Sequence, residues 1–181
     1  LFVTSRCHPL ALALVTPIAA ELNQPVSVIS GRASDLPPVK RLLNKVVDYS
    51  HEWHRRFADG AAQIQVIATQ MPALDYLRTV AAHRLVFQLD QSSVPGQVAG
   101  DALLCRVPCV GGNGTAERLI FPSLCGHGRT SGELLDLVRR LIKDDDFHAE
   151  MIRLSVALAR EKMCFSVARM ELEGFYASIA A

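Results

Sequence analysis

The sequence predicts an α/β fold, a doubly wound parallel sheet in a three-layer α/β/α arrangement that is followed by C-terminal helices. Two observations carry this prediction. Short apolar segments of strand length alternate with helical patterns over most of the 181 residues, and the end of the chain is helical throughout. Two neighbouring parallel strands need a long crossover connection, and a helix between them provides it. Strands that alternate with helices are therefore expected to pair in parallel. The chain is long enough to bury a full core and is interpreted as one domain, residues 1–181.

Each element is predicted by its own pattern. Strands are expected where apolar residues form short runs, at residues 1–5, 25–30, 63–68, 85–89 and 107–110. Helices are expected where apolar residues recur every three or four positions, at residues 8–22, 37–57, 72–82, 96–105, 133–143, 146–163 and 166–179. Pro17 falls inside the first helix and is expected to kink or shorten it. Residues 118–121 are interpreted as a short edge strand, and residues 123–132 as a loop.

The stretch from residue 85 to residue 117 organises the predicted sheet. It contains a strand, a loop, a helix and a second strand, which is the βαβ unit of a Rossmann-like sheet, and Val98, Ala102 and Cys105 share one face of its helix. In open sheets of this kind, ligands bind outside the carboxyl ends of the strands. The loops at residues 90–96 and 111–117 follow the two strands of the unit, so the sequence predicts a ligand site where these loops meet.

Composition excludes several classes of function. The net charge of +1 gives no electrostatic reason to expect nucleic acid or an anionic membrane surface as a partner, and no apolar run is long enough for a transmembrane segment. The five cysteines are scattered and odd in number, which indicates reduced thiols of a cytoplasmic protein. Cys105-x3-Cys109 and His51-x-x-His54 both lack further ligands, so no metal site is expected. A nicotinamide cofactor is not expected either, because no Gly-x-Gly-x-x-Gly follows the first strand.

Three stretches of the chain carry a resemblance to a known family. Residues 101–110, DALLCRVPCV, look like a segment with an acidic residue, an apolar pair and a Val-Pro-Val-Val strand. Residues 113–117, NGTAE, are similar to a Gly-Gly-x-x-Glu turn, and residues 141–176 are similar to closing helices with an Asp-Pro-like break and a Phe-Ser-Trp-like start. In this order, they resemble the C-terminal, nucleotide-sugar-binding domain of retaining glycosyltransferases with the GT-B fold (glycosyl transferases group 1).

The resemblance implies roles for residues on both sides of the predicted cleft. Gly96 matches the second Gly of the family's Glu-Gly-Phe-Gly motif, and the backbone N–H groups of Gln97 and Val98 would hold the donor diphosphate at a helix N-terminus. Asp101 would accept hydrogen bonds from the ribose hydroxyls, and Arg6 would neutralise the diphosphate. The remaining donor-binding candidates are Ser93, Gly114 and Glu117. The resemblance implies no metal ion and no cofactor beyond the nucleotide-sugar.

Each of these residues also has a simpler interpretation. Arg6 is equally well read as a solvated arginine at a strand end, and Asp101 as a first-turn residue that suits the helix dipole. Glu117 is alternatively a cap of the segment that follows it. Three glycines of the second loop are interpreted as turn residues that need a positive φ, namely Gly111, Gly112 and Gly114.

The chain also departs from the family pattern. Ser93 stands where the family carries a Glu near the donor sugar, Ala11 replaces an expected Lys, and Arg106 replaces a Gly. The function predicted is therefore a glycosyltransferase donor domain for a UDP- or GDP-sugar, inactive on its own, with the acceptor held by an N-terminal domain. Its setting is expected to be cytoplasmic, either free or peripheral to a membrane. The alternatives are a degenerate, non-catalytic domain that acts as an interaction or scaffold module, and a sugar-nucleotide epimerase of related architecture.

Overall fold

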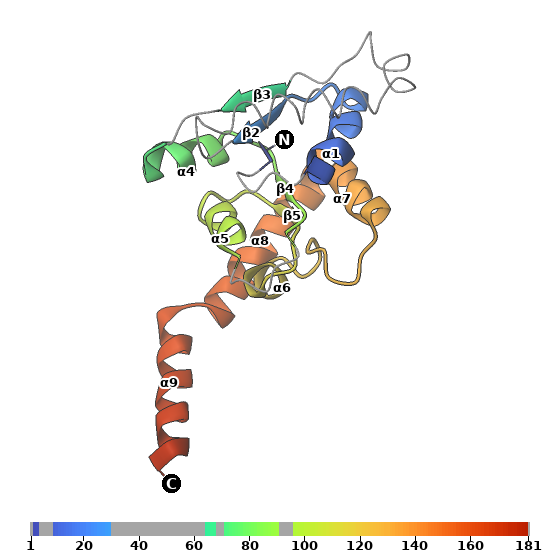
Figure 1. Ribbon diagram of the computed structural model, residues 1–181. Helices are drawn as coiled ribbons and strands as arrows, with labels where there is room; N and C mark the ends of the chain where they lie inside the picture. Colours follow the sequence, from blue (N-terminus) through green and yellow to red (C-terminus); the bar gives the residue numbers. More distant parts are fainter. Residues whose placement is uncertain (1, 4–8, 30–63, 68–70, 91–95, 181) are drawn as a thin grey trace.

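The computed structural model describes residues 2–3, 9–29, 64–67, 71–90 and 96–180 (Figure 1). Its centre is a five-stranded sheet in the order β3-β2-β1-β4-β5, with every neighbouring pair parallel. The strands are β1 (Phe2–Val3), β2 (Val26–Ile29), β3 (Ile64–Ile67), β4 (Val86–Gln88) and β5 (Cys109–Gly111). All five fall within or next to the predicted segments, and the α/β class is confirmed.

Seven helices lie in the described part of the chain. They are α1 (Pro9–Glu21), α4 (Ala73–Ala81), α5 (Gln97–Leu104), α6 (Thr115–Ile120), α7 (Ser131–Lys143), α8 (Asp145–Lys162) and α9 (Phe165–Ala180). The predicted helix at residues 37–57 lies outside the described residues. Pro17 does not shorten α1, which continues to Glu21. The proline removes one backbone donor, whereas Val15, Ile18 and Ala19 around it are buried in the core and keep the helix in place.

The expected edge strand at residues 118–121 is wrong. This segment belongs to α6, which starts at Thr115 and buries Ala116 and Ile120. These two residues are four positions apart, which places them on one face of a helix, and α6 packs against α8. An apolar run as short as Leu119-Ile120-Phe121 is compatible with either structure, because its periodicity covers less than two helical turns.

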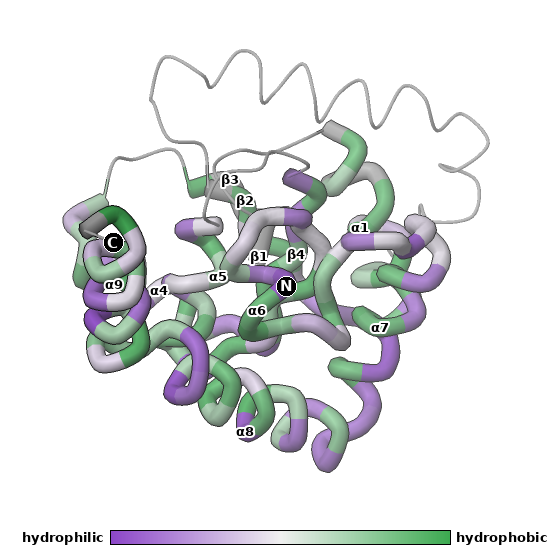
Figure 2. The backbone as a smooth tube through the Cα atoms, turned by 90° about the horizontal axis from the view of Figure 1, so that it is seen from below, coloured by the Kyte–Doolittle hydropathy of each residue, from purple (hydrophilic) through white to green (hydrophobic). Residues whose placement is uncertain are grey.

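The core lies around the central strands and extends into the helices. Phe87 and Leu85 near β4, Ile120 in α6 and Leu141 in α7 are among the largest fully buried side chains. The outer helices α7 and α8 alternate between hydrophobic and hydrophilic stretches (Figure 2), as expected for helices with one buried face. Val98 and Cys105 pack against the core as partly buried residues beside the fully buried Ala99 and Ala102 of the same helix.

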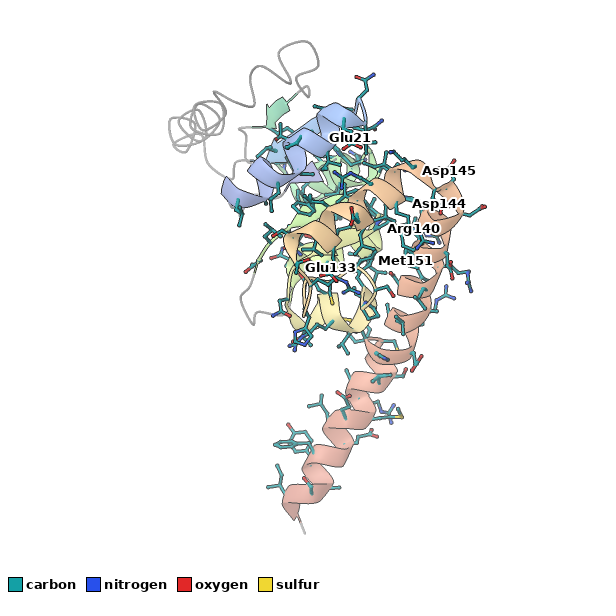
Figure 3. All side chains as sticks on the ribbon, turned by 90° about the vertical axis from the view of Figure 1, so that its right-hand side faces the viewer. Glu21, Glu133, Arg140, Asp144, Asp145 and Met151 are labelled. Carbon is teal, nitrogen blue, oxygen red and sulfur yellow. The ribbon has the colours of Figure 1, made fainter. Side chains whose placement is uncertain are left out.

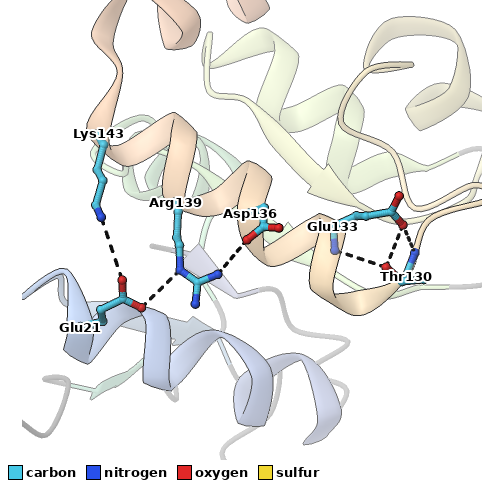
Figure 4. Close-up of polar contacts among 6 residues, drawn as sticks. All are labelled: Glu21, Thr130, Glu133, Asp136, Arg139 and Lys143. Atoms are coloured by element: carbon cyan, nitrogen blue, oxygen red, sulfur yellow. Dashed lines mark hydrogen bonds and ion pairs between the residues drawn. The ribbon is translucent and has the colours of Figure 1, made fainter.

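Side-chain hydrogen bonds define the starts of α7 and α8. Thr130 forms a capping box with Glu133: the Thr130 Oγ1 accepts from the Glu133 N–H at 3.3 Å, and Glu133 Oε2 accepts from the Thr130 N–H at 2.7 Å (Figure 4). The hydrogen bonds that the Glu133 carboxylate accepts from the Thr130 N–H and hydroxyl group lower the pKa of Glu133. At the next helix, Asp144 Oδ1 accepts from the Phe147 N–H at 2.8 Å.

Ion pairs connect α7 to neighbouring elements. Glu21 at the end of α1 pairs with Arg139 at 3.2 Å and with Lys143 at 4.0 Å (Figure 4). Figure 3 shows Glu21 beside α7, with Asp144 and Asp145 at the junction of α7 and α8. At that junction Arg84, which precedes β4, donates to the Leu141 carbonyl at 2.9 Å and pairs with Asp145. Such half-exposed pairs orient the helices more than they stabilise them.

The C-terminal helix α9 extends away from the rest of the protein (Figure 1). Its large apolar side chains are exposed, with Phe165 at 97% and Phe175 at 60%. The helix therefore contributes little to the core.

Arg106 occupies a backbone conformation that favours glycine, with φ of 56°. It follows the end of α5, where the Val107 N–H donates to the Ala102 carbonyl and the Arg106 N–H to the Leu103 carbonyl, each at 2.9 Å. This pair of bonds is the Schellman motif, in which glycine is preferred at the position of Arg106.

Arg106→Gly is expected to stabilise the protein by about 1 kcal/mol, since the left-handed conformation costs an L-residue about 1–2 kcal/mol and glycine loses part of that gain as chain entropy. For a domain of this size the midpoint of thermal unfolding should rise by about 2–4 °C. Calorimetry of both proteins measures the change, and a fall in midpoint would show that the exposed Arg106 side chain contributes a stabilising contact instead.

Candidate functional site

The two loops of the predicted site meet at the carboxyl ends of β4 and β5. The Gly112 N–H donates to the Gln88 carbonyl at 3.1 Å, and the Asn113 N–H donates to the Asp90 carbonyl at 2.9 Å. The segment after β5 therefore lies directly against the segment after β4. This is the placement that the parallel βαβ unit predicts.

Gly96 is the N-cap of α5 and lies against Glu117. Its φ of 89° and ψ of 56° are left-handed, and no side chain of the described residues caps the helix. A Cβ at this position would lie 2.1 Å from Glu117 Oε2, so a side chain cannot fit here without displacing the carboxyl group. The first turn of α5, with Gln97 exposed and Val98 half-buried, carries backbone N–H groups that have no partner within the helix.

Glu117 is a buried acid, 2% exposed, in the first turn of α6. Its Oε1 accepts a hydrogen bond from Gln88 Nε2 at 2.7 Å, whereas Oε2 has no hydrogen-bond partner in the described part of the protein. Burial raises the pKa of Glu117, and the charge of Asp90 adds to this rise. The Gln88 amide and the backbone N–H groups of Glu117 and Gly114 act in the opposite direction.

Gln88 and Cys109 extend this polar cluster into the sheet, and the sequence analysis did not single them out as site residues. Gln88 is the last residue of β4 and is 5% exposed, and its Nε2 also lies 3.5 Å from Cys109 Sγ on β5. Burial raises the pKa of the Cys109 thiol to about 12, so it stays protonated. The signal in the sequence was the polar Gln88 inside the apolar run LVFQL, since a buried polar side chain needs a partner.

Asp101 is the fifth residue of α5, so its interpretation as a first-turn residue is wrong. It is half-buried and interacts with the hydroxyl group of Tyr76 on α4. Burial raises the pKa of Asp101, while the hydrogen bond from Tyr76 lowers it, and burial likewise raises the pKa of Tyr76. Asp101, the predicted ligand of the ribose hydroxyls, thus lies beside Tyr76, and the sequence did not indicate this contact.

The other candidates divide into three groups. Gly111 and Gly112 have positive φ values of 85° and 70°, as predicted for turn residues. The same prediction is wrong for Gly114, whose φ of −71° is an ordinary value for the N-cap of α6. Arg6 and Ser93 lie outside the described residues, as does the His51-x-x-His54 pair.

Further features of the described residues bear on other classes of function. No group of three His, Cys, Asp or Glu side chains in this part of the chain is arranged to hold a metal ion. None of the helices described here is both long and apolar enough to cross a membrane. Four of the cysteines are free thiols, Cys105, Cys109, Cys125 and Cys164.

A cavity of about 690 Å³ lies beside α4 and β2, away from the candidate site. Its lining includes Arg78, His83 and Arg84. The two arginines are already paired with Asp75 and Asp145, so this cavity offers an anion little free positive charge.

No protein-family model matches the sequence, and no curated protein matches it. The function is therefore inferred from the geometry of the site and from the chemistry of its residues.

Proposed function

We propose that this chain is the donor-binding domain of a glycosyltransferase and that it binds a UDP- or GDP-sugar at the carboxyl ends of β4 and β5. The observation that carries the proposal is the N-terminus of α5, which begins at the left-handed Gly96 without a capping side chain among the described residues and lies beside the carboxyl ends of β4 and β5. A helix N-terminus that begins with a left-handed glycine and has no capping side chain suits the phosphates of a nucleotide. The acceptor would be held by a further domain, and the chain alone would catalyse no transfer.

We further propose the Rossmann-like, three-layer architecture for this domain. The strand order β3-β2-β1-β4-β5 is the order of the first five strands in dinucleotide-binding sheets, and the order reverses between β1 and β4. Helices α1 and α7 contact one another, as do α4 and α5, which is consistent with separate helical layers. Ligands of such sheets bind at the reversal point, which adjoins the candidate site.

Asp101 and Tyr76 would define the nucleoside end of the ligand. A carboxylate offers two acceptor oxygens to the two ribose hydroxyls, and the Tyr76 hydroxyl fixes the position of the carboxylate. The family resemblance assigns a charge at the diphosphate to Arg6, which lies outside the described residues.

Calorimetric titration with UDP, GDP, ADP and their sugars tests the proposal. Wild-type protein is expected to bind one nucleotide series, and Asp101→Asn to bind it about ten times more weakly or worse, because one good charged hydrogen bond contributes about 1.5–3 kcal/mol. Asp75→Asn is the matched control, since Asp75 is an exposed acid on α4 that pairs only with Arg78 in the described residues. Equal weakening by both variants would assign the effect to net charge.

Absence of binding for every nucleotide would overturn the donor-domain proposal and favour the non-catalytic scaffold module. Clear sugar transfer by the chain alone would instead contradict the statement that it needs a further domain.

A further inference from the structure

The position of Glu117 creates an electrostatic conflict with the ligand proposed above. Its carboxyl group is 2% exposed and lies against Gly96, the residue that starts α5. One carboxyl oxygen is paired with the Gln88 amide, and the other, Oε2, has no partner among the described residues and faces Gly96, the N-cap of α5. If this carboxyl group were ionised, its negative charge would lie next to the N-terminus of α5, where we propose that the ligand phosphates bind.

Among the described residues, the groups that surround Glu117 supply no compensating positive charge. From the β4 side it meets the neutral Gln88 and the negative Asp90, and from β5 it meets the protonated Cys109. Both α5 and α8 pack against α6. The buried residues of α5 are Ala99 and Ala102, and those of α8 are Phe147, Met151 and Ser155, none of which titrates. Among the described residues, only amide and backbone N–H dipoles act to favour the ionised form.

We propose that an anionic ligand binds at the N-terminus of α5 together with one proton, which Glu117 takes up and holds on Oε2 while the ligand is bound. The inference rests on the proposed function for the class of ligand, a nucleoside diphosphate sugar. Its own content is the coupling between the ligand and the proton.

Protonation removes the conflict in two ways. It cancels the negative charge beside the ligand phosphates. It also turns Oε2, an acceptor without a partner among the described residues, into an O–H donor at the N-terminus of α5, where the ligand phosphates supply acceptor oxygens. The proton comes from solvent, and no covalent bond of the ligand changes. The pKa of Glu117, which burial already raises in the free protein, rises further when the phosphates arrive.

The test uses UDP-glucose and GDP-mannose as probes, because their phosphates are diesters that carry no titrating proton near neutral pH. Titration calorimetry is run from pH 5.5 to 8.5, with two buffers of different ionisation enthalpy at each pH. Wild-type protein is expected to take up to one proton per ligand and to lose affinity by up to about tenfold per pH unit above the pKa of Glu117 in the free protein. Glu117→Gln, which is neutral at every pH, is expected to bind with constant affinity and no proton uptake.

Two further measurements make each outcome informative. Glu150→Gln removes the charge of an exposed acid on α8 and should keep the wild-type pH profile of binding.

Thermal unfolding without ligand reports the protonation state of Glu117 directly. A raised pKa stabilises the folded protein at low pH, and that contribution disappears as pH rises through the folded-state value, so wild type should fall below Glu117→Gln in midpoint at high pH.

Ligand binding with no proton uptake, and with the same pH profile in wild type and Glu117→Gln, would overturn the coupling and leave the proposed function standing. No binding of either probe at any pH would overturn both, whatever the unfolding midpoints show. Proton uptake that persists in Glu117→Gln would assign the proton to another group and would also overturn the inference.

Discussion

Gly111→Ala is expected to destabilise the protein by about 3 kcal/mol or more. Gly111 ends β5 with φ of 85°, and a Cβ at this position would lie 1.9 Å from the backbone carbonyl oxygen of Gln88. Left-handed strain costs an L-residue about 1–3 kcal/mol. The clash adds to this cost, because its partner is backbone in the adjacent strand, paired in register with Gly111, and cannot rotate away as a side chain would.

Gly100→Ala provides the matched comparison. Gly100 lies inside α5, and a Cβ there would meet nothing within 4 Å. Alanine has the higher helix propensity, so this variant should be more stable than wild type by about 0.5–1 kcal/mol. Urea unfolding of the three proteins gives the free energies. A loss below about 1 kcal/mol for Gly111→Ala would mean that β4 and β5 separate easily at their carboxyl ends.

Phe87→Ala is expected to cost about 3–5 kcal/mol, the typical loss for truncation of a fully buried phenylalanine. Phe87 is completely buried in β4, where it is paired with Val3 of β1 and Val110 of β5. Removal of the ring leaves a cavity at the middle of the sheet that neighbouring strands cannot fill, since each is fixed by its own hydrogen bonds. Because total stability of a domain is only about 5–15 kcal/mol, the variant should unfold at a much lower urea concentration.

Phe175→Ala, on the projecting helix α9, is the control for Phe87→Ala. It tests whether the loss of stability comes from the burial of the ring or from the removal of any phenylalanine. This ring is 60% exposed, and its aromatic neighbour is Tyr176, with ring centroids 5.9 Å apart. The same substitution should therefore change the free energy of unfolding by less than about 0.5 kcal/mol. A large loss at Phe175 would show that α9 is packed in solution in a way that Figure 1 does not show.

The sheet was the most predictable part of this protein. Each strand is a short run composed mostly of apolar residues, and such runs, separated by helices, admit few arrangements. The segment at residues 118–121 could not be assigned in this way, because its apolar run is too short to show a period and its helical start depends on packing against α8. Arg106 illustrates another limit, since its left-handed backbone is imposed by the end of α5 and not by its own preference.

The candidate site was predictable in position but not in its internal contacts. The loops after β4 and β5 meet because parallel strands place their carboxyl ends at one edge. The hydrogen bond from Gln88 to Glu117, however, joins residues of two different elements, and no spacing rule relates them. The same holds for Tyr76 and Asp101, which come from α4 and α5.

The position of β1 has a consequence for how the protein folds. Phe2 and Val3 lie in the middle of the sheet, between partners that begin at Ser27 on one side and at Val86 on the other. The pairing with β4 brings together segments that are distant in sequence, which raises the contact order of the protein. Chains of this kind fold slowly, because the entropy of closing a long loop is lost before the pairing repays it. Until β4 arrives, one edge of the hydrophobic strand β1 has no partner, and the nascent sheet can associate with other unfolded chains.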